Sequence, residues 1–334
     1  MIVTGVGVGN QRPSAACTRT WAQTRRIESM KVMITGAAGY VGWSVLNVLA
    51  GRPEVDEILV YDNFARRNYG LLLADKPRGR RKVRVTVDEI LNGRGMQRAV
   101  QGADCVCHLA ALAPSPFNND NPHAFDQVNH WGTAEACYAV EDGGVPRMVY
   151  VSSGAVYGFP DGIADVTTEP MPANAYGSSK LAGERHVQRL SAQRATVILR
   201  AGTVYGLNPV ARFDTFVNRF VLDAALGRAL HVHGSGEQAR PVVHVDALAH
   251  AVTKAILGEV ESGVHDVVET NATVNEAVGV LREYDATVEF IHTNQQARLR
   301  DLRVEPTAVH GLLPPGDRQF SDVLPEMLEQ IRLS

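Results

Sequence analysis

The 334-residue chain lacks the features that mark several large classes of protein. It has no uninterrupted apolar run near the ~20 residues that a membrane-spanning helix needs. Its formal net charge is −3, and no basic stripe runs along it, which is unlike a nucleic-acid-binding protein. We therefore expect neither a membrane nor a nucleic acid among its partners.

Cysteine is also scarce, since the chain has only four, at positions 17, 105, 107 and 137. Their spacing fits neither a disulfide framework nor a zinc site, so we expect no metal and predict reduced, packed thiols. Reduced thiols are typical of the cytoplasm, and that is where we expect this protein to reside.

The composition that is present, 45% hydrophobic and 21% charged, is that of a globular protein large enough for one main domain and a smaller one. Apolar runs alternate with segments of helical spacing, and this rhythm predicts an α/β fold with a Rossmann-type, doubly wound parallel sheet. We expect a disordered extension at 1–29, a nucleotide-binding domain at 30–205 and a smaller substrate-binding domain at 206–334, of which 241–250 returns to the core. The predicted strands lie at 31–35, 57–61, 82–87, 104–108, 147–152 and 195–200.

The first predicted strand, at 31–35, leads into a glycine-rich turn. This turn reads Gly36-Ala37-Ala38-Gly39-Tyr40-Val41-Gly42, and a segment of helical spacing follows it. Glycines at such a turn let the backbone approach a pyrophosphate at the helix N-terminus. The next strand ends in Asp62, about 20 residues past the last glycine, where a carboxylate accepts hydrogen bonds from the adenosine ribose. Together these features predict a dinucleotide site.

Asp62 also bears on which dinucleotide is bound. A carboxylate at this position repels the 2′-phosphate of NADP, so the sequence favours NAD. Arg66 and Arg67 follow closely and leave NADP open as the alternative, because they could neutralise its 2′-phosphate.

A second group of residues predicts proton transfer. Tyr176 and Lys180 lie four residues apart, so a helix would project both from one face. An ammonium beside a phenol lowers the phenol's pKa, which starts near ~10. Ser153 ends an apolar strand and supplies a hydroxyl for the same substrate oxygen. We therefore predict Ser153, Tyr176 and Lys180 as the catalytic residues.

With these motifs in this order, from about Lys31 to about Phe320, the chain resembles the extended short-chain dehydrogenase/reductase superfamily. Within it, the chain is similar to the NAD-dependent epimerase/dehydratase family and to UDP-glucose 4-epimerase-like nucleotide-sugar enzymes. Further segments that match the family's signatures are His108-Leu109-Ala110-Ala111, Val128-Asn129-His130-Trp131-Gly132-Thr133 and Leu199-Arg200-Ala201-Gly202-Thr203-Val204-Tyr205-Gly206.

The resemblance implies two sets of contacts around the catalytic residues. Those expected to hold NAD are Gly36, Ala38, Gly39, Tyr40, Val41, Asp62, Asn63, Asp88, Glu89, Leu109, Ala110, Ala111, Asn129, Val151, Tyr176, Lys180 and Thr203. Those expected to hold the substrate are Leu112, Ser153, Gly154, Ala155, Thr203 and Arg240, the last as a guanidinium for a diphosphate.

The resemblance also implies a reaction. Family members oxidise a sugar hydroxyl, with the tyrosine removing the proton and NAD taking the hydride, and the keto sugar is then processed further. The 4,6-dehydratases carry an Asp-Glu pair where this chain has Gly154 and Ala155, neither of which transfers protons. We therefore expect an NAD-dependent epimerase that inverts C4 of a nucleotide-linked hexose through a transient keto sugar and enzyme-bound NADH.

Two other functions stay open on the sequence. One is a dehydrogenase or reductase of another alcohol or ketone, NAD- or NADP-dependent, including a natural-product intermediate, since Thr203 stands where many UDP-sugar epimerases have asparagine. The other is a non-catalytic dinucleotide-binding regulator, which would typically have lost the tyrosine or the lysine. The resemblance further implies a homodimer, formed by the helices near 121–143 and 174–193.

Overall fold

The computed structural model describes residues 29–73, 82–114, 121–293, 301–307, 311–313 and 319–332. The extension predicted at 1–29 lies outside the described residues, apart from Ser29 at its end.

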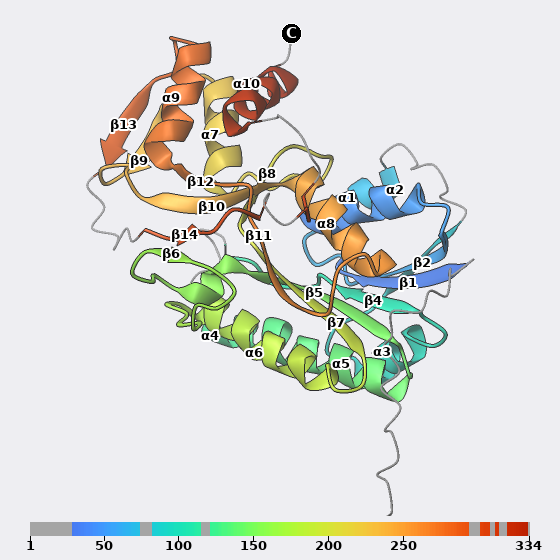
Figure 1. Cartoon of the computed structure of the whole chain (residues 1–334). Coiled ribbons are helices and arrows are strands. Elements are labelled where there is room, and N and C mark those ends of the chain that lie inside the picture. Colours follow the sequence, from blue (N-terminus) through green and yellow to red (C-terminus); the bar gives the residue numbers. More distant parts are fainter. Residues whose placement is uncertain are drawn as a thin grey trace, which may run out of the picture.

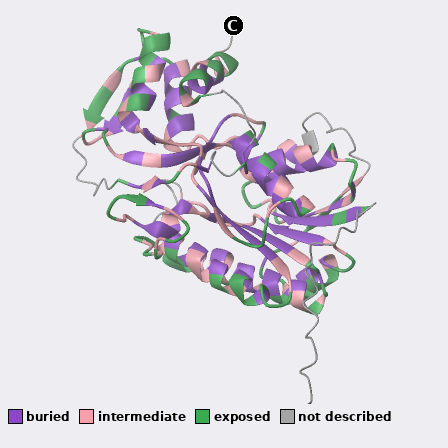
Figure 2. Ribbon diagram, in the orientation of Figure 1, coloured by how far each residue is buried: buried purple, intermediate pink, exposed green. Residues whose placement is uncertain are grey.

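A parallel sheet of seven strands forms the centre of the molecule, in the order β11-β7-β5-β4-β1-β2-β3 (Figure 1). Its middle strands are apolar and buried on both faces, as in β4, where every residue is fully buried. Figure 2 shows the same burial across the centre of the sheet. The strands are β1 (Met30–Thr35), β2 (Val55–Asp62), β3 (Val83–Val87), β4 (Cys105–His108), β5 (Arg147–Ser153), β7 (Ala195–Ala201) and β11 (Gly263–Val267).

Helices cover both faces of this sheet, which makes it doubly wound as predicted. On one face α1 (Tyr40–Ala50) and α8 (Val245–Leu257) pack together and share a core with the sheet. The other face carries α3 (Gly93–Ala99), α5 (Gly132–Asp142) and α6 (Ala175–Leu190). The shorter helices are α2 (Gly70–Leu73), α4 (Pro122–Phe125), the π-helical η2 (Asp126–Trp131) and the 3₁₀ turn η3 (Gly154–Tyr157).

A second, smaller unit stands beyond the C-terminal ends of the strands, with its own apolar core. Its helices are amphipathic, as in α7, where apolar residues three or four positions apart face inward. The elements of this unit are β8 (Thr203–Tyr205), α7 (Phe216–Ala225), β9 (Leu230–His233), β10 (Ala239–His244), β12 (Thr270–Thr273), α9 (Val274–Tyr284), β13 (Phe290–Thr293) and α10 (Phe320–Ile331). The short strands β6 (Ile163–Ala164) and β14 (Arg303–Val304) pair beside it.

The return of the chain to the main sheet is longer than the predicted 241–250. All of α8 packs on α1, and β11 then adds a seventh strand beside β7. Strand β11 is not predicted from the sequence because His265 and Asp266 interrupt its apolar pattern. The smaller unit is therefore built from separate stretches of the chain, on either side of α8 and β11.

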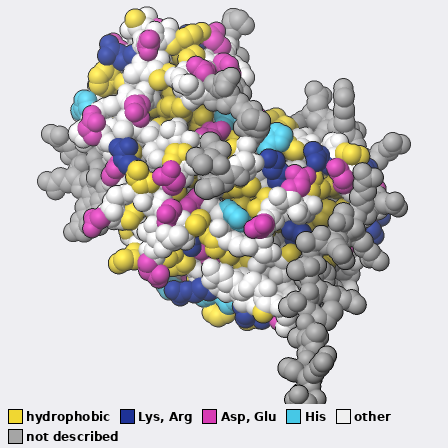
Figure 3. Space-filling model, viewed as in Figure 1, with side chains coloured by type: hydrophobic (Ala, Val, Ile, Leu, Met, Phe, Trp, Pro, Cys, Tyr) yellow, Lys and Arg dark blue, Asp and Glu magenta, His cyan; other side chains and the backbone are white. Residues whose placement is uncertain are grey.

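The surface charges and the buried cysteines agree with what the composition predicts. Figure 3 shows charges of both signs dispersed over the visible face. Cys105, Cys107 and Cys137 are buried and unbridged. In the described part of the chain, every helix is too short or too polar to cross a bilayer. Cytoplasmic location stays a prediction.

Candidate active site

A cavity of about 610 Å³ opens at the C-terminal ends of the parallel strands, between the main sheet and the smaller unit. This is the position at which doubly wound folds bind their ligands. Every site residue predicted from the sequence lines this cavity, except Asn129. The lining residues among them are Gly36, Ala38, Gly39, Tyr40, Val41, Asp62, Asn63, Asp88, Glu89, Leu109, Ala110, Ala111, Leu112, Val151, Ser153, Gly154, Ala155, Tyr176, Lys180, Thr203 and Arg240.

The glycine turn brings backbone close to backbone at one end of the cavity. Gly36 has a φ of +74°, and a Cβ on it would lie 2.6 Å from the amide nitrogen of Ala110. Helix α1 begins at Tyr40, after the N-cap Gly39, without a side-chain cap and with no acidic residue in its first turn. Its N-terminus therefore keeps its partial positive charge, and this suits a pyrophosphate.

Two carboxylates at the ends of β2 and β3 mark the predicted adenosine end. Asp62 accepts hydrogen bonds from the backbone amides of Ala38 (2.9 Å) and Phe64 (2.8 Å), which fix its orientation at the cavity wall. The Asp88 carboxylate accepts from the side-chain amide of Asn92, and this hydrogen bond lowers the pKa of Asp88. Both acids are thus held as oriented acceptors for hydroxyl or amino donors.

Asn129 lies behind the cavity wall rather than in it. Its side-chain amide accepts from the backbone N–H of Leu112 (2.7 Å) and donates to the Leu112 carbonyl (2.9 Å). It also donates to the Ser179 hydroxyl on α6. Asn129 therefore positions Leu112, which lines the cavity, and ties it to the helix that carries the predicted catalytic residues.

His108, at the end of β4, is a structural anchor. Its ring nitrogens lie 2.7 Å from the Thr35 hydroxyl and 3.0 Å from the Thr133 hydroxyl. Burial, with a smaller effect of the Lys180 charge, lowers the pKa of His108 to about 3. The ring is therefore neutral at physiological pH and joins β1, β4 and α5.

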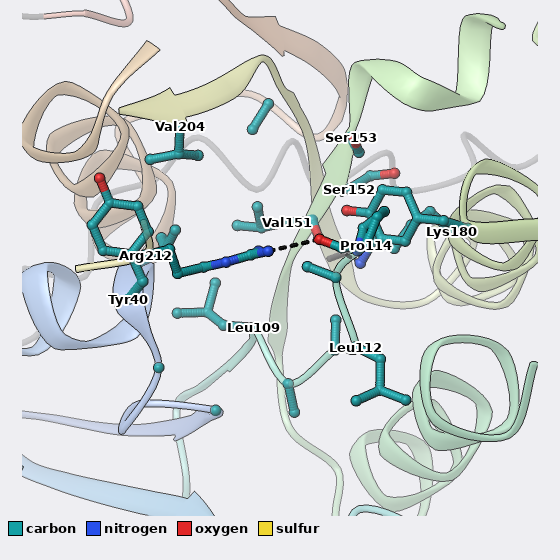
Figure 4. Close-up of a pocket in the computed structure, with 18 of the residues that line it drawn as sticks. Tyr40, Leu109, Leu112, Pro114, Val151, Ser152, Ser153, Lys180, Val204 and Arg212 are labelled. Carbon is teal, nitrogen blue, oxygen red and sulfur yellow. Dashed lines mark hydrogen bonds between the residues drawn. The ribbon is translucent and has the colours of Figure 1, made fainter. Parts of the chain in front are cut away.

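The three predicted catalytic residues meet at the other end of the cavity. Ser153 ends β5 and lies close enough to Tyr176 to lower the pKa of its phenol. Lys180 follows one turn after Tyr176 on α6, and its ammonium donates to the Val151 carbonyl at 2.8 Å. The same ammonium lies 4.1 Å from the centre of the Tyr150 ring. Figure 4 shows Ser153, Val151 and Lys180 together on this side.

The electrostatics of Tyr176 differ from the expectation in one respect. Burial raises the pKa of Tyr176, while the hydrogen bond from Ser153 and the charge of Arg212 lower it. Lys180, which we expected to lower this pKa, is turned to the Val151 carbonyl, and burial lowers its own pKa to about 7. Burial, and not the charge of Lys180, therefore dominates the pKa of Tyr176 in this structure.

The predicted substrate residues lie near Ser153. Gly154 and Ala155 begin the 3₁₀ turn after β5, and they place no titratable group in the cavity. Thr203 lies on β8. Arg240, on β10, donates to the carbonyl of Ala239 at 2.8 Å, and burial lowers its pKa.

Several polar residues of the cavity are not predicted from the sequence. The Ser152 hydroxyl is buried and has no hydrogen-bond partner within the described residues. Arg212 and Asp214 form an ion pair at the wall, and Arg212 also donates to the carbonyl of Pro114, as the dashed line in Figure 4 shows. The segment of Arg212 and Asp214 follows the Tyr205-Gly206 motif as an irregular loop, and no periodicity singles it out.

Comparison with known proteins gives the family. The sequence model of the NAD dependent epimerase/dehydratase family matches residues 32–269, well over half of the chain. The chain belongs to this family. The resemblance seen in the motifs is thereby confirmed, and membership identifies the protein as one of a family of NAD-dependent nucleotide-sugar epimerases and dehydratases.

Relatives of this family member include both kinds of enzyme. The chain is 29% identical to the uncharacterized UDP-glucose epimerase YtcB of Bacillus subtilis (strain 168) over 237 residues. This alignment covers 69% of this chain and 73% of the relative. It is also 26% identical to a dTDP-glucose 4,6-dehydratase of Mycobacterium tuberculosis over 234 residues. This alignment covers 68% of this chain and 69% of the dehydratase. The same fold is found in the solved structure of a UDP-glucuronic acid 4-epimerase of Bacillus cereus in complex with UDP-glucuronic acid and NAD. The two structures superpose with a TM-score of 0.78 at 21% sequence identity, over 90% of this chain and 100% of the epimerase chain.

NAD is the cofactor of this family, and the cavity of this member fits it. The uncapped N-terminus of α1 and the close approach of the glycine turn suit the pyrophosphate. The unpartnered Ser152 hydroxyl leaves a buried polar atom for a ligand to satisfy. Predicted adenosine and catalytic residues line the two ends of one continuous cavity.

Proposed function

We propose that this protein is an NAD-dependent epimerase that inverts C4 of a nucleotide-linked hexose. The observation that carries the proposal is the lining beside the Ser153–Tyr176–Lys180 group. Gly154 and Ala155 occupy the positions at which the 4,6-dehydratases have an acid and a base. The site therefore retains the groups for oxidation and re-reduction but lacks the pair that eliminates water.

Each residue of the group has a defined task in this reaction. Tyr176 removes the proton from the C4 hydroxyl and later returns it, while the Ser153 hydroxyl donates a hydrogen bond to the same oxygen. Lys180 orients the nicotinamide ribose of NAD. When bound there, NAD would supply the hydride acceptor for the oxidation at C4 and, in its reduced form, the hydride donor for either face of the keto sugar.

The two ends of the substrate are assigned to different walls. Arg240 is proposed to contact the diphosphate, for which a guanidinium fork is suited. Thr203, with one hydroxyl, is proposed to hold a sugar hydroxyl. Gly154, which has no side chain, and Ala155, which has only a methyl group, leave room for the sugar to turn. Turning presents the opposite face of the keto sugar for re-reduction.

The test is incubation of the purified protein and NAD with UDP-, dTDP- and GDP-sugars, followed by chromatography with mass detection. A new peak of unchanged mass supports epimerisation and names the substrate. A product lighter by one water identifies a dehydratase, and accumulation of free NADH identifies a dehydrogenase. Either of the last two results overturns the proposal.

Variants connect the result to the site. Tyr176→Phe is expected to lower kcat by about 10²–10⁴-fold, the range that general acid–base catalysis contributes, with bound NAD unchanged. Tyr284→Phe, which removes an exposed phenol in α9, is the matched control and is expected to keep full activity. Full activity of Tyr176→Phe would refute the assignment of proton transfer.

A further inference from the structure

An arginine side chain bridges the two walls of the cavity. Arg212 belongs to the loop between β8 and α7, in the smaller unit. Its Nε and Nη2 each lie 2.8 Å from a carboxylate oxygen of Asp214, and Nη2 also donates to the Pro114 carbonyl at 2.7 Å. Pro114 follows β4 of the main sheet, so these bonds join segments of different units.

The position of this bridge is seen in Figure 4. The Arg212 side chain extends from the side of Tyr40 toward Pro114, with Val151 and Leu109 beside it, and Lys180 lies beyond Pro114. Only 18% of the side chain is exposed. The guanidinium thus crosses the cavity between the N-terminus of α1 and the predicted catalytic residues.

A second arginine reinforces the positive charge at this crossing. Arg66, in the loop after β2, also lines the cavity. Burial and the neighbouring charge of Arg212 lower the pKa of Arg66, while Asp214 counteracts them. Arg66 and Arg212 therefore add positive charge to this part of the cavity lining, where Asp214 is the carboxylate paired with Arg212.

We propose that Arg212, held by Asp214 and the Pro114 carbonyl and assisted by Arg66, closes over the bound dinucleotide and retains it between turnovers. A dinucleotide that reaches from Asp62 to Lys180 must pass this bridge. The excess positive charge attracts its pyrophosphate, and its release requires the bonds of Arg212 to break. This role rests on the NAD dependence of the family and not on the sugar or the carbon inverted.

The test is the rate at which bound NAD exchanges. Wild-type protein is loaded with NAD, freed of excess by gel filtration and mixed with radiolabelled NAD without any sugar. Arg212→Gln is expected to accelerate exchange by about tenfold or more, the effect of losing one good charge-assisted contact. Asp214→Asn, which keeps the guanidinium but loosens it, is expected to accelerate exchange about threefold or more.

Arg84→Gln is the matched control, because this arginine is 77% exposed, pairs with Glu57 and lies outside the cavity. Exchange rates of Arg212→Gln and Asp214→Asn within about twofold of wild type would overturn the proposal. Circular dichroism verifies folding, and should Arg212→Gln fail to fold, Arg212→Lys replaces it, since lysine keeps the charge but cannot make both bonds of the bridge. Because no sugar is present, the outcome is independent of whether the protein epimerises.

Discussion

A buried carboxylate on the edge strand β11 gives the sharpest stability prediction. Asp266 on β11 is 8% exposed and accepts from the Tyr157 hydroxyl at 2.8 and 3.0 Å. Arg200 donates to the same hydroxyl and forms an ion pair with Glu184. Burial raises the pKa of Asp266 from 3.8 to about 6, although the Tyr157 hydrogen bond and the Arg200 charge act in the opposite direction.

The magnitude follows from proton linkage. Because the folded protein holds this proton more tightly than the unfolded chain, the stabilisation is complete below about pH 3.8 and is lost as pH rises through 6. The difference between 3.8 and about 6 corresponds to roughly 3 kcal/mol, of which roughly half is lost between pH 5 and pH 8. Asp266→Asn resembles the protonated acid at every pH and should escape this loss.

The assay is thermal or urea unfolding of wild type and Asp266→Asn from pH 5 to pH 8. The Tm of the variant relative to wild type should increase by roughly 3 °C across this range, at about 2 °C for each kcal/mol in a chain of this size. Asp161→Asn, which neutralises an exposed carboxylate, is the matched control. A Tm difference that stays constant with pH, or a variant that loses stability relative to wild type as pH rises, would refute the reasoning.

Three further predictions concern other parts of the molecule. Gly36→Ala should lower the free energy of unfolding by roughly 3 kcal/mol and weaken NAD binding, because the added Cβ would clash with the Ala110 backbone at a positive φ. Calorimetry with and without NAD measures the stability and the binding. Arg200→Met should cost roughly 3–5 kcal/mol in urea unfolding, since it leaves the buried Glu184 unpaired, and a loss below about 1 kcal/mol would contradict this. If the predicted homodimer forms through η2, α5 and α6, then Trp131→Arg, at a 46% exposed tryptophan, should shift the mass measured by light scattering to that of one chain.

The local parts of the site could be predicted from the sequence because their chemistry is local. The glycine turn, Asp62 and Ser153 each follow an apolar strand directly, and parallel strands end at one edge of a sheet. Tyr176 and Lys180 share a helix face by spacing alone. All of these residues line the cavity of the structure.

The parts that could not be predicted depend on distant segments of the chain. The Arg212 guanidinium is positioned in part by its hydrogen bond to the carbonyl of Pro114, 98 residues earlier, and the sequence around neither residue predicts this bond. The direction of Lys180 toward Val151 is likewise a matter of packing, and so is the burial that raises the pKa of Tyr176, which we expected to be lowered. Asn129 was predicted at the cofactor because its motif belongs to the family, whereas the contacts of its side chain are made behind the wall.

The path of the chain between its two units limits how this protein can be divided. The chain enters the smaller unit from β7 to β8, leaves it from β10 to α8 and enters again from β11 to β12. No single cut within these described connections separates the complete seven-stranded sheet from the complete smaller unit. The smaller unit therefore cannot be exchanged between proteins as one continuous segment of sequence, because the exchanged pieces would have to be joined at several points along the chain.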